Sequence, residues 1–555
     1  MSVAPAAQRP ARGAALRRLV NDMERADWLL LAAFAAMAVA ILAALATRPL
    51  AMTGAESGVV ADQLQYFGWI RVAGEDVVIR NVWDIDPEGT SYFVHPGFLV
   101  AGLLHQLGLS IPLAYQILWK PVAVGLIFFA FRGYVRRLLA DRSARLAALA
   151  IALFYVSPLA AAIDLLSLGS VDFRKELRFL VGEAFPGTYV WGYLMTAIAV
   201  GLLPAVLLAT ERAAVPERRR TGRSGAFYLG WAAAGALMVS WLQPWQGVAL
   251  VATVGLVELV RWGTREVSIA QSARVLGPVL VGALLPLLYY WVLERVDPAW
   301  EIAGQANRNF QLGWPASVWL LGLGPLVLPA ALAYRRRRLD WQGLAVRVLP
   351  LAMVGEYFLI SASGLGTFPF HSLQGISLPL GILAVEGAAT LRPTAWWAGR
   401  ARWVGVALAA TLALGVADRL DQIRIEIHKG GQPYLLEDGE QAAFDYLEGL
   451  DRPGGVLAPI YSGLMVPYQT GRETWVGQIS WTPGYRDRVE RADALFSGRL
   501  ERDRALRLVS GSGAAFLYAD CLKRRDLARL LAPYLTSVRR FGCATVYEVD
   551  RRALP

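Results

Sequence analysis

Charged residues are scarce in this chain of 555 residues, where 18% are Asp, Glu, Lys or Arg against about 25% in soluble domains. The charge is missing from repeated apolar runs of about 17–23 residues, long enough to cross about 30 Å of hydrocarbon. The mean hydropathy is accordingly positive, at +0.40. These features exclude a soluble globular protein and predict a polytopic α-helical membrane protein.

The motifs of many soluble enzymes are also missing. No glycine-rich loop precedes a Lys-Ser or Lys-Thr pair, no Gly-x-Gly-x-x-Gly opens a helix, and no Gly-x-Ser-x-Gly elbow occurs. The four histidines are far apart in the sequence and do not form a cluster with metal-ligand spacing: His95, His105, His371 and His428. A recognisable nucleotide site and a histidine–cysteine metal centre are therefore excluded.

Lysine is rare, because only four of the 55 basic residues are lysine and the rest are arginine. Basic residues of membrane proteins remain on the cytoplasmic side, so the net charge of +11 indicates topology and not a nucleic-acid partner. We expect the plasma (inner) membrane of a bacterium, with the N-terminus in the cytoplasm and the C-terminus outside. The arginine-rich loops that indicate this orientation are 134–143, 211–224, 261–274, 334–341 and 391–402.

About eleven transmembrane helices are expected within a membrane domain over residues 27–417. Residues 1–26 are interpreted as a disordered cytoplasmic tail. The first outer loop, 48–112, is long, and its apolar stretch 96–109 is too short to cross the bilayer, so we expect an interfacial or re-entrant helix there. The predicted spans are 27–47, 113–133, 144–163, 189–210, 226–242, 246–262, 271–293, 313–333, 342–360, 373–390 and 401–417.

The pattern changes after residue 417, where short apolar runs alternate with amphipathic stretches. Residues 418–555 are therefore predicted to form a small extracytoplasmic α/β domain. Cys521 and Cys543 both lie in this domain, and outside the cytoplasm they either form a disulfide or remain two buried thiols. The segment 470–488 carries two tryptophans and several arginines, which suits either a sugar-binding platform or packing between domains.

The first outer loop contains the segment GVVADQLQYFGWIR, which begins at Gly58. On a helix, Asp62, Tyr66 and Trp69 share one face. A carboxylate beside aromatic rings at the outer leaflet is partly desolvated, which raises its pKa and suits a general base near neutral pH. The alternatives are that Asp62 only caps a helix or pairs with Arg71.

The segment DQLQYFGWIR resembles the first outer-loop motif of the GT-C superfamily, membrane glycosyltransferases that use polyprenyl-phosphate sugars. Asp62, Tyr66 and Arg71 match its Asp, Tyr and basic residue, whereas Gln63 stands where the family often has a second acid. The predicted layout of spans, outer loop and outer domain is also similar. The resemblance implies a GT-C-like fold and an enzyme that transfers sugar from a lipid-linked donor to a glycan or lipid acceptor. Asp62 would be the general base of this reaction.

A departing lipid phosphate needs cations at the outer face, where arginine, lysine or histidine side chains bind it. The second outer loop offers Arg174, Lys175 and Arg178, which break the rule that basic residues stay inside. Arg308 and His371 complete the predicted donor-phosphate set. The alternatives are a solvated amphipathic helix for the first three and a helix cap for His371.

Sugar or acceptor contacts are expected from polar and aromatic residues at the same face of the membrane. A cofactor is not required by the sequence, although Asp84 and Asp86 leave a divalent metal open as an alternative. Lys120 lies inside an apolar run, where it either snorkels or reaches a lipid phosphate. The residues expected to contact sugar or acceptor are Glu56, Tyr66, Trp69, His95, Gln243 and Trp245.

Two other functions stay open at this point. A transporter or flippase of a lipid-linked glycan predicts charged residues inside the spans, of which Glu356 is the main example. A non-catalytic envelope assembly protein predicts that Asp62→Asn leaves function unchanged.

Overall fold

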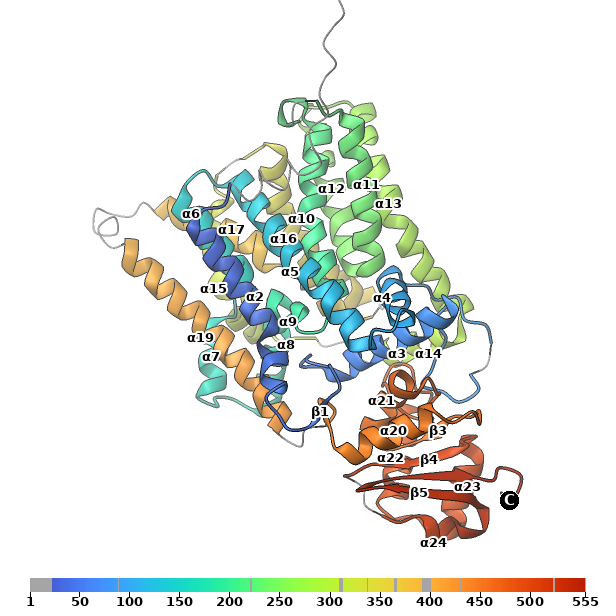
Figure 1. The fold of residues 1–555 in the computed structure, drawn as a ribbon. Helices are drawn as coiled ribbons and strands as arrows, with labels where there is room; N and C mark the ends of the chain where they lie inside the picture. The colour runs from blue at the N-terminus through green and yellow to red at the C-terminus, as the bar shows by residue number, and fades with distance from the viewer. Residues whose placement is uncertain are drawn as a thin grey trace, which may run out of the picture.

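The structure, a computed structural model, describes residues 22–87, 89–219, 222–308, 313–336, 338–363, 367–391, 401–428, 432–522 and 525–554. Long helices form a bundle, and a small domain with a β-sheet lies at one end of it (Figure 1). Most of the predicted N-terminal tail, 1–26, falls outside the described residues. The polytopic helical fold with a small C-terminal α/β domain is confirmed.

Within the described residues, nine helices are long and apolar enough to cross a membrane. Each of them coincides with one of the predicted apolar runs. They are α2 (Arg25–Leu45), α5 (Ile111–Leu138), α10 (Leu194–Ala214), α11 (Gly225–Leu242), α12 (Pro244–Gly263), α13 (Ile269–Val296), α15 (Ala316–Ala333), α16 (Trp341–Ser363) and α19 (Ala401–His428).

The structure differs from the prediction in the other two runs. The run 144–163 is a pair of helices, α6 (Arg142–Phe154) and α7 (Pro158–Leu165), bent by 43°. Pro158 causes this break, because proline disfavours a helical conformation in the residue before it. The run 373–390 is the shorter helix α17 (Ser377–Ala388), which follows a 3-10 turn, η2 (Pro369–Leu373).

Short helices gather at the end of the bundle that faces the small domain (Figure 1). The predicted first outer loop contains two of them, α3 (Val60–Asp76) and α4 (Pro96–Gln106). These two pack closely because they meet at glycines: a Cβ on Gly102 would lie 2.5 Å from the backbone nitrogen of Gly74. At 11 residues α4 is too short to span, as predicted. The other short helices are α8 (Val171–Ala184), α9 (Pro186–Val190) and α14 (Pro298–Arg308).

The C-terminal domain contains a four-stranded sheet in the order β3-β4-β6-β5. Strand β3 is parallel to β4, and the other neighbours are antiparallel. Cys521 and Cys543 form a disulfide that joins the segment after β4 to the β5–β6 turn. The strands are β3 (Val456–Leu457), β4 (Phe516–Ala519), β5 (Leu535–Phe541) and β6 (Ala544–Val549), and the helices are α20 (Asp438–Glu448), α21 (Ile460–Thr470), α22 (Tyr485–Phe496), α23 (Arg502–Ser512) and α24 (Ala528–Leu531).

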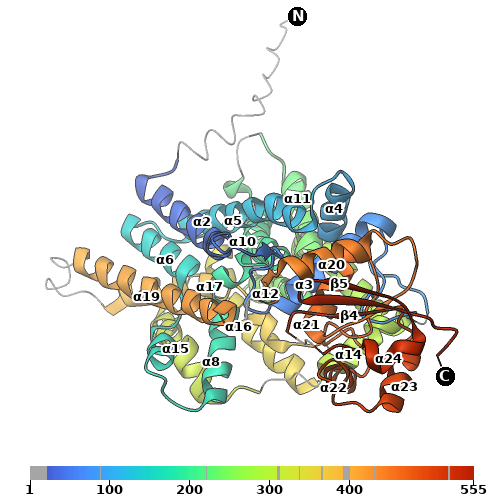
Figure 2. The ribbon, with the colours of Figure 1, turned by 60° about the horizontal axis from the view of Figure 1, so that its bottom comes forward.

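The C-terminal domain is joined to the bundle in three ways. Helix α19 continues past residue 417, where the last span was expected to end, and finishes at His428. Strand β1 (Ala51–Met52) of the first outer loop pairs with β2 (Leu435–Leu436). Seen from this end, the domain lies over α3 and α14, to one side of α8, α15 and α19 (Figure 2). The domain therefore covers the part of the bundle that carries Asp62.

Candidate active site

Asp62 lies in the first turn of α3 and is half-buried. Its Oδ2 atom accepts a hydrogen bond from the Tyr193 hydroxyl at 2.9 Å, and its Oδ1 atom accepts one from Gln478 Nε2 at 3.3 Å. Burial raises the pKa of the Asp62 carboxyl, while the Tyr193 bond and the nearby His371 act in the opposite direction. These are the surroundings that suit a proton acceptor near neutral pH.

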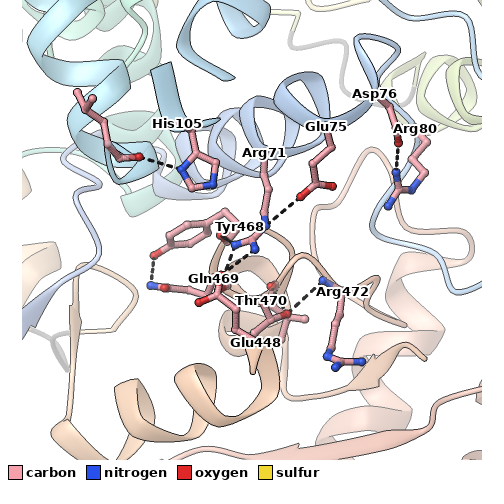
Figure 3. A network of polar contacts seen from close by, with 12 residues as sticks. Arg71, Glu75, Asp76, Arg80, His105, Glu448, Tyr468, Gln469, Thr470 and Arg472 are labelled. Carbon is pink, nitrogen blue, oxygen red and sulfur yellow. Dashed lines mark hydrogen bonds and ion pairs between the residues drawn. The ribbon is translucent and has the colours of Figure 1, made fainter. Parts of the chain in front are cut away.

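Both alternatives for Asp62 fail on geometry. The residue that caps α3 is Val59. Arg71 donates instead to the backbone carbonyls of Tyr468 and Gln469, at 3.0 and 3.3 Å, and forms an ion pair of 2.7 Å with Glu448 (Figure 3). Arg71, the basic residue of the motif, therefore fastens α3 to the C-terminal domain.

Tyr66 lies beside Asp62. Burial is the main cause of the raised pKa of the Tyr66 hydroxyl, and the negative charge of Asp62 is the second cause. Its ring is 6.1 Å from that of Tyr193, edge on. Trp69, one turn further along α3, is only 7% exposed and packs against Trp481 of the C-terminal domain at 5.1 Å. On the predicted face of α3, Asp62 and Tyr66 therefore lie in the candidate site, whereas Trp69 packs at the junction with the C-terminal domain.

His371, in η2, is the centre of a second group of polar residues. Its Nδ1 atom lies 3.1 Å from Glu183 Oε2 and 3.0 Å from Gln374 Nε2, so it donates to the first or accepts from the second according to the tautomer. Gln243 in turn donates to Gln374 Oε1 at 2.5 Å, and the Trp245 ring meets His371 edge on at 4.9 Å. Two of the predicted site residues, Gln243 and Trp245, are therefore brought close to a third, His371.

Helices α7, α8 and α19 enclose a small cavity that we call the arginine pocket. Asp164 accepts hydrogen bonds of 2.6 Å from both Arg178 Nε and Gln422 Nε2. Arg419 donates to Gln422 Oε1 at 2.9 Å and to the carbonyl of Arg178 at 3.2 Å. Three guanidinium groups thus face two carboxylates, and the polar lining residues are Asp164, Arg174, Arg178, Asp418, Arg419 and Gln422.

Arg419 lies near the His371 group, because a Cβ on Gly182, the residue before Glu183, would lie 2.8 Å from the Arg419 guanidinium. Arg419 is not among the cations predicted from the sequence, because the predicted boundary after residue 417 separates it from the spans. The sequence nevertheless contains a feature that could have identified Arg419. An arginine that directly follows an apolar run costs free energy at membrane depth unless other groups pair with it.

The remaining predicted cations lie outside the arginine pocket. The Lys175 side chain is 63% exposed and has only a loose pair with Asp172 at 3.6 Å, so it belongs to the solvated face of α8. Arg308, at the end of α14, pairs with Glu294 of α13 at 2.9 Å.

Glu56 is fully buried and forms an ion pair with Lys120. The Lys120 ammonium also donates to the carbonyls of Ala38 at 2.9 Å and Val190 at 2.7 Å. Lys120 therefore neither snorkels nor is directed to a lipid phosphate: it joins the predicted first outer loop and α9 to α2. Glu56 is thus part of a buried structural ion pair.

His95 caps α4, where its Nδ1 atom accepts from the backbone nitrogen of Phe98 at 3.4 Å. Burial lowers the pKa of His95 to about 3, so the imidazole is neutral at neutral pH. Asp84 pairs with Arg488 at 2.7 Å, and Asp86 follows it in the connection to α4. Among the described residues, no group of three or more His, Cys, Asp or Glu side chains is arranged to hold a metal ion.

The bundle with its short helices and small C-terminal domain has a fold similar to that of a solved oligosaccharyltransferase, which agrees with the GT-C-like fold expected from the sequence. The oligosaccharyltransferase of Archaeoglobus fulgidus in the apo form superposes with a TM-score of 0.52 at 10% identity, covering 91% of this chain and 71% of that one. The same enzyme tethered to an acceptor peptide with the NVT sequon gives 0.50 at 12% identity, covering 95% and 74%.

A further similar structure is ArnT from Cupriavidus metallidurans bound to undecaprenyl phosphate, with a TM-score of 0.48 at 14% identity over 97% of this chain and 98% of that one. No family model and no curated protein matches the sequence. The likeness therefore concerns the fold, and the chemistry must be argued from the residues of this chain.

Proposed function

We propose that this chain is a polyprenyl-phosphate-dependent glycosyltransferase that acts at the extracytoplasmic face of the membrane. The observation that carries the proposal is the environment of the Asp62 carboxylate, namely its burial and its hydrogen-bond partners. It is half-buried, it has no ion-pair partner within the described part of the chain, and two neutral donors, Tyr193 and Gln478, hold its oxygens. A carboxylate used only for structure is usually paired with a cation when it is removed from water. The fold shared with an oligosaccharyltransferase supports the same conclusion.

In this reaction the Asp62 carboxylate takes the proton of the acceptor hydroxyl. The acceptor oxygen then attacks the anomeric carbon of the donor sugar, and the bond from that carbon to the phosphate oxygen breaks. The polyprenyl phosphate leaves with the electron pair of that bond. Burial raises the pKa of Tyr193, which therefore keeps its proton and continues to orient Asp62.

We assign the donor phosphate to His371 and the arginine pocket, with Arg174, Arg178 and Arg419 as its cations. Guanidinium groups match phosphate oxygens in charge and geometry. Access from the bilayer is supported by α19, which forms one wall of the pocket and buries only 17% of its most apolar stretch inside the protein. Most of this helix therefore faces hydrocarbon, which is where the lipid chain of the donor lies.

Tyr66 and Trp245 are assigned to the sugar or acceptor, because their rings lie beside Asp62 and His371, respectively. Aromatic side chains offer apolar faces to sugar rings. Glu56, Trp69, His95 and Gln243 are assigned an indirect part, since each of these side chains is buried in the surrounding protein.

The test uses the purified full-length protein in liposomes, with undecaprenyl phosphate that carries a radiolabelled hexose and a bacterial membrane-lipid extract as acceptor. We expect release of undecaprenyl phosphate and label in a new glycosidic bond. Asp62→Asn should slow this step about 10²–10⁴-fold, the usual contribution of a general base. The control is Asp76→Asn on the same helix, because Asp76 is 60% exposed and pairs with Arg80.

Movement of the labelled lipid across the bilayer without a new bond would support the transporter. Equal activity of Asp62→Asn and the wild type would reject the role of Asp62 as the base.

A further inference from the structure

A loop of the C-terminal domain reaches into the site. This loop, residues 477–482, is buried except at Ile479. Asn81, after α3, donates to the carbonyl of Trp481 at 2.9 Å, and the Ser480 hydroxyl bonds to Asn307 of α14 at 2.7 Å. The loop is therefore fixed on two sides by the membrane domain.

Aromatic packing holds the same loop from a third direction. The ring of Trp481 lies 5.1 Å from that of Trp69 on α3 and 5.3 Å from that of Trp300 on α14, in edge-to-face contacts. Such pairs add about 0.5–1.5 kcal/mol each beyond the area that they bury. Loop 477–482 is thus placed against α3 firmly enough to position a side chain next to Asp62.

Gln478 is the residue of this loop that touches Asp62, and its amide has only one favourable orientation. Gln478 Oε1 accepts the backbone N–H of Ser480 at 2.5 Å, so its amide nitrogen must face Asp62 Oδ1, 3.3 Å away. A flipped amide would set oxygen against oxygen and leave the Ser480 N–H without its acceptor. At 2% exposure, Gln478 has little contact with water that would compensate for this.

We propose that the C-terminal domain completes the catalytic centre, and that Gln478 is a positioning residue that orients Asp62 and stabilises its ionised form. This inference rests on the proposed role of Asp62 as the base. It explains why the outer domain lies over α3: without loop 477–482, one oxygen of the carboxylate would lose its donor.

The charge state of Asp62 depends on groups from several elements. Tyr193 precedes α10, His371 is in η2, Glu183 is on α8, and Tyr66 is one turn along α3. Burial raises the pKa of Asp62, and the hydrogen bonds from Tyr193 and Gln478 oppose this. Removal of the Gln478 donor should therefore raise the pKa of Asp62 further.

The experiment is a pH titration of the purified full-length protein by infrared difference spectroscopy. The carboxyl band of Asp62 is assigned by its loss in Asp62→Asn. Gln478→Met keeps the length of the side chain and removes the donor, and we expect it to raise the pKa of Asp62 by about one unit, the size of a hydrogen bond to an ionised group. The matched control is Gln469→Met, because Gln469 lies in the same domain and donates to the Tyr468 hydroxyl at 2.9 Å.

A second variant, Gln478→Glu, sets an acid against Asp62 and should raise its pKa more than Gln478→Met does. It also keeps an oxygen for the Ser480 N–H, so that the loop can fold if Gln478→Met does not. An unchanged pKa of Asp62 in the folded Gln478 variants, or an equal shift in Gln469→Met, would overturn the proposal.

Sugar transfer measured on the same samples separates the two proposals. We expect the acid side of the kcat profile to move with the pKa of Asp62 while KM for the donor stays constant. A shift in the infrared titration without any sugar transfer by the wild type would leave the positioning by Gln478 standing and reject the glycosyltransferase.

Discussion

Arg71→Met is the most informative single change at the domain junction. The guanidinium of Arg71 joins α3 to α20 and α21 of the C-terminal domain through the carbonyls of Tyr468 and Gln469 and the carboxylate of Glu448 (Figure 3). Methionine keeps the apolar stem of the side chain and removes these polar contacts. We expect the docking of the C-terminal domain on α3 to weaken.

The expected loss can be worked out from the exposure of each partner. Glu448 and Glu75 are 48% and 38% exposed, so their ion pairs with Arg71 are screened and worth about 0–1 kcal/mol each. The two carbonyls receive a charged donor, and each such bond contributes about 1.5 kcal/mol or more. The docking free energy should therefore fall by about 3 kcal/mol, which is roughly a hundredfold in the opening equilibrium.

Hydrogen exchange of the full-length protein in detergent measures this opening. Backbone amides near the end of α21 should exchange roughly a hundred times faster in Arg71→Met, since exchange follows local opening. The control is Arg80→Met, because Arg80 is 35% exposed and its ion pairs with Asp76 at 2.8 Å and Glu473 at 3.7 Å are screened by solvent. If Arg71→Met exchanged no faster than Arg80→Met, the assignment of Arg71 to domain docking would be wrong.

Two further predictions concern the site. Tyr193→Phe removes a hydrogen bond that lowers the pKa of Asp62, so this pKa should rise by about one unit. Because activity needs the ionised carboxylate, it should be lost at a higher pH on acidification. An unchanged acid limb of the pH–rate profile would contradict this. Arg419→Ala should weaken binding of undecaprenyl phosphate at least about tenfold. Arg424→Ala on the same helix is the control, since Arg424 is 62% exposed, and equal losses of affinity in a binding titration would argue against the arginine pocket.

The sequence predicted the helices well, because a segment that crosses the bilayer must be apolar and helical along its own length, whatever its neighbours in space. In the described part of the chain, all nine long apolar helices fall on predicted runs. The break at Pro158 was not predicted, because the run 144–163 is expected to form one span, although proline marks the boundary between α6 and α7. Helical spacing explains why Arg178 lines the arginine pocket whereas Lys175 is exposed. Arg174 and Arg178 are four residues apart and share a helix face, and Lys175 lies on another face.

The partners of these residues were not readable from the sequence. Tyr193 lies 131 positions from Asp62, and Gln478 lies 416 positions away. Local spacing carries no information about such contacts, which arise only when several helices and a separate domain pack together. The same holds for Cys521 and Cys543, for which composition left a disulfide and two thiols equally open.

By itself, therefore, the sequence determined a helical membrane domain, an α/β domain after it and one acidic residue on a short helix after the first span. Each of these follows from hydropathy, periodicity or a short motif. Only the tertiary structure decided which groups surround Asp62, which arginines converge, and that the C-terminal domain contributes Gln478 to the same site. The physical reason is that the protonation and orientation of a buried carboxylate depend on its neighbours in space, which the order of residues along the chain does not specify.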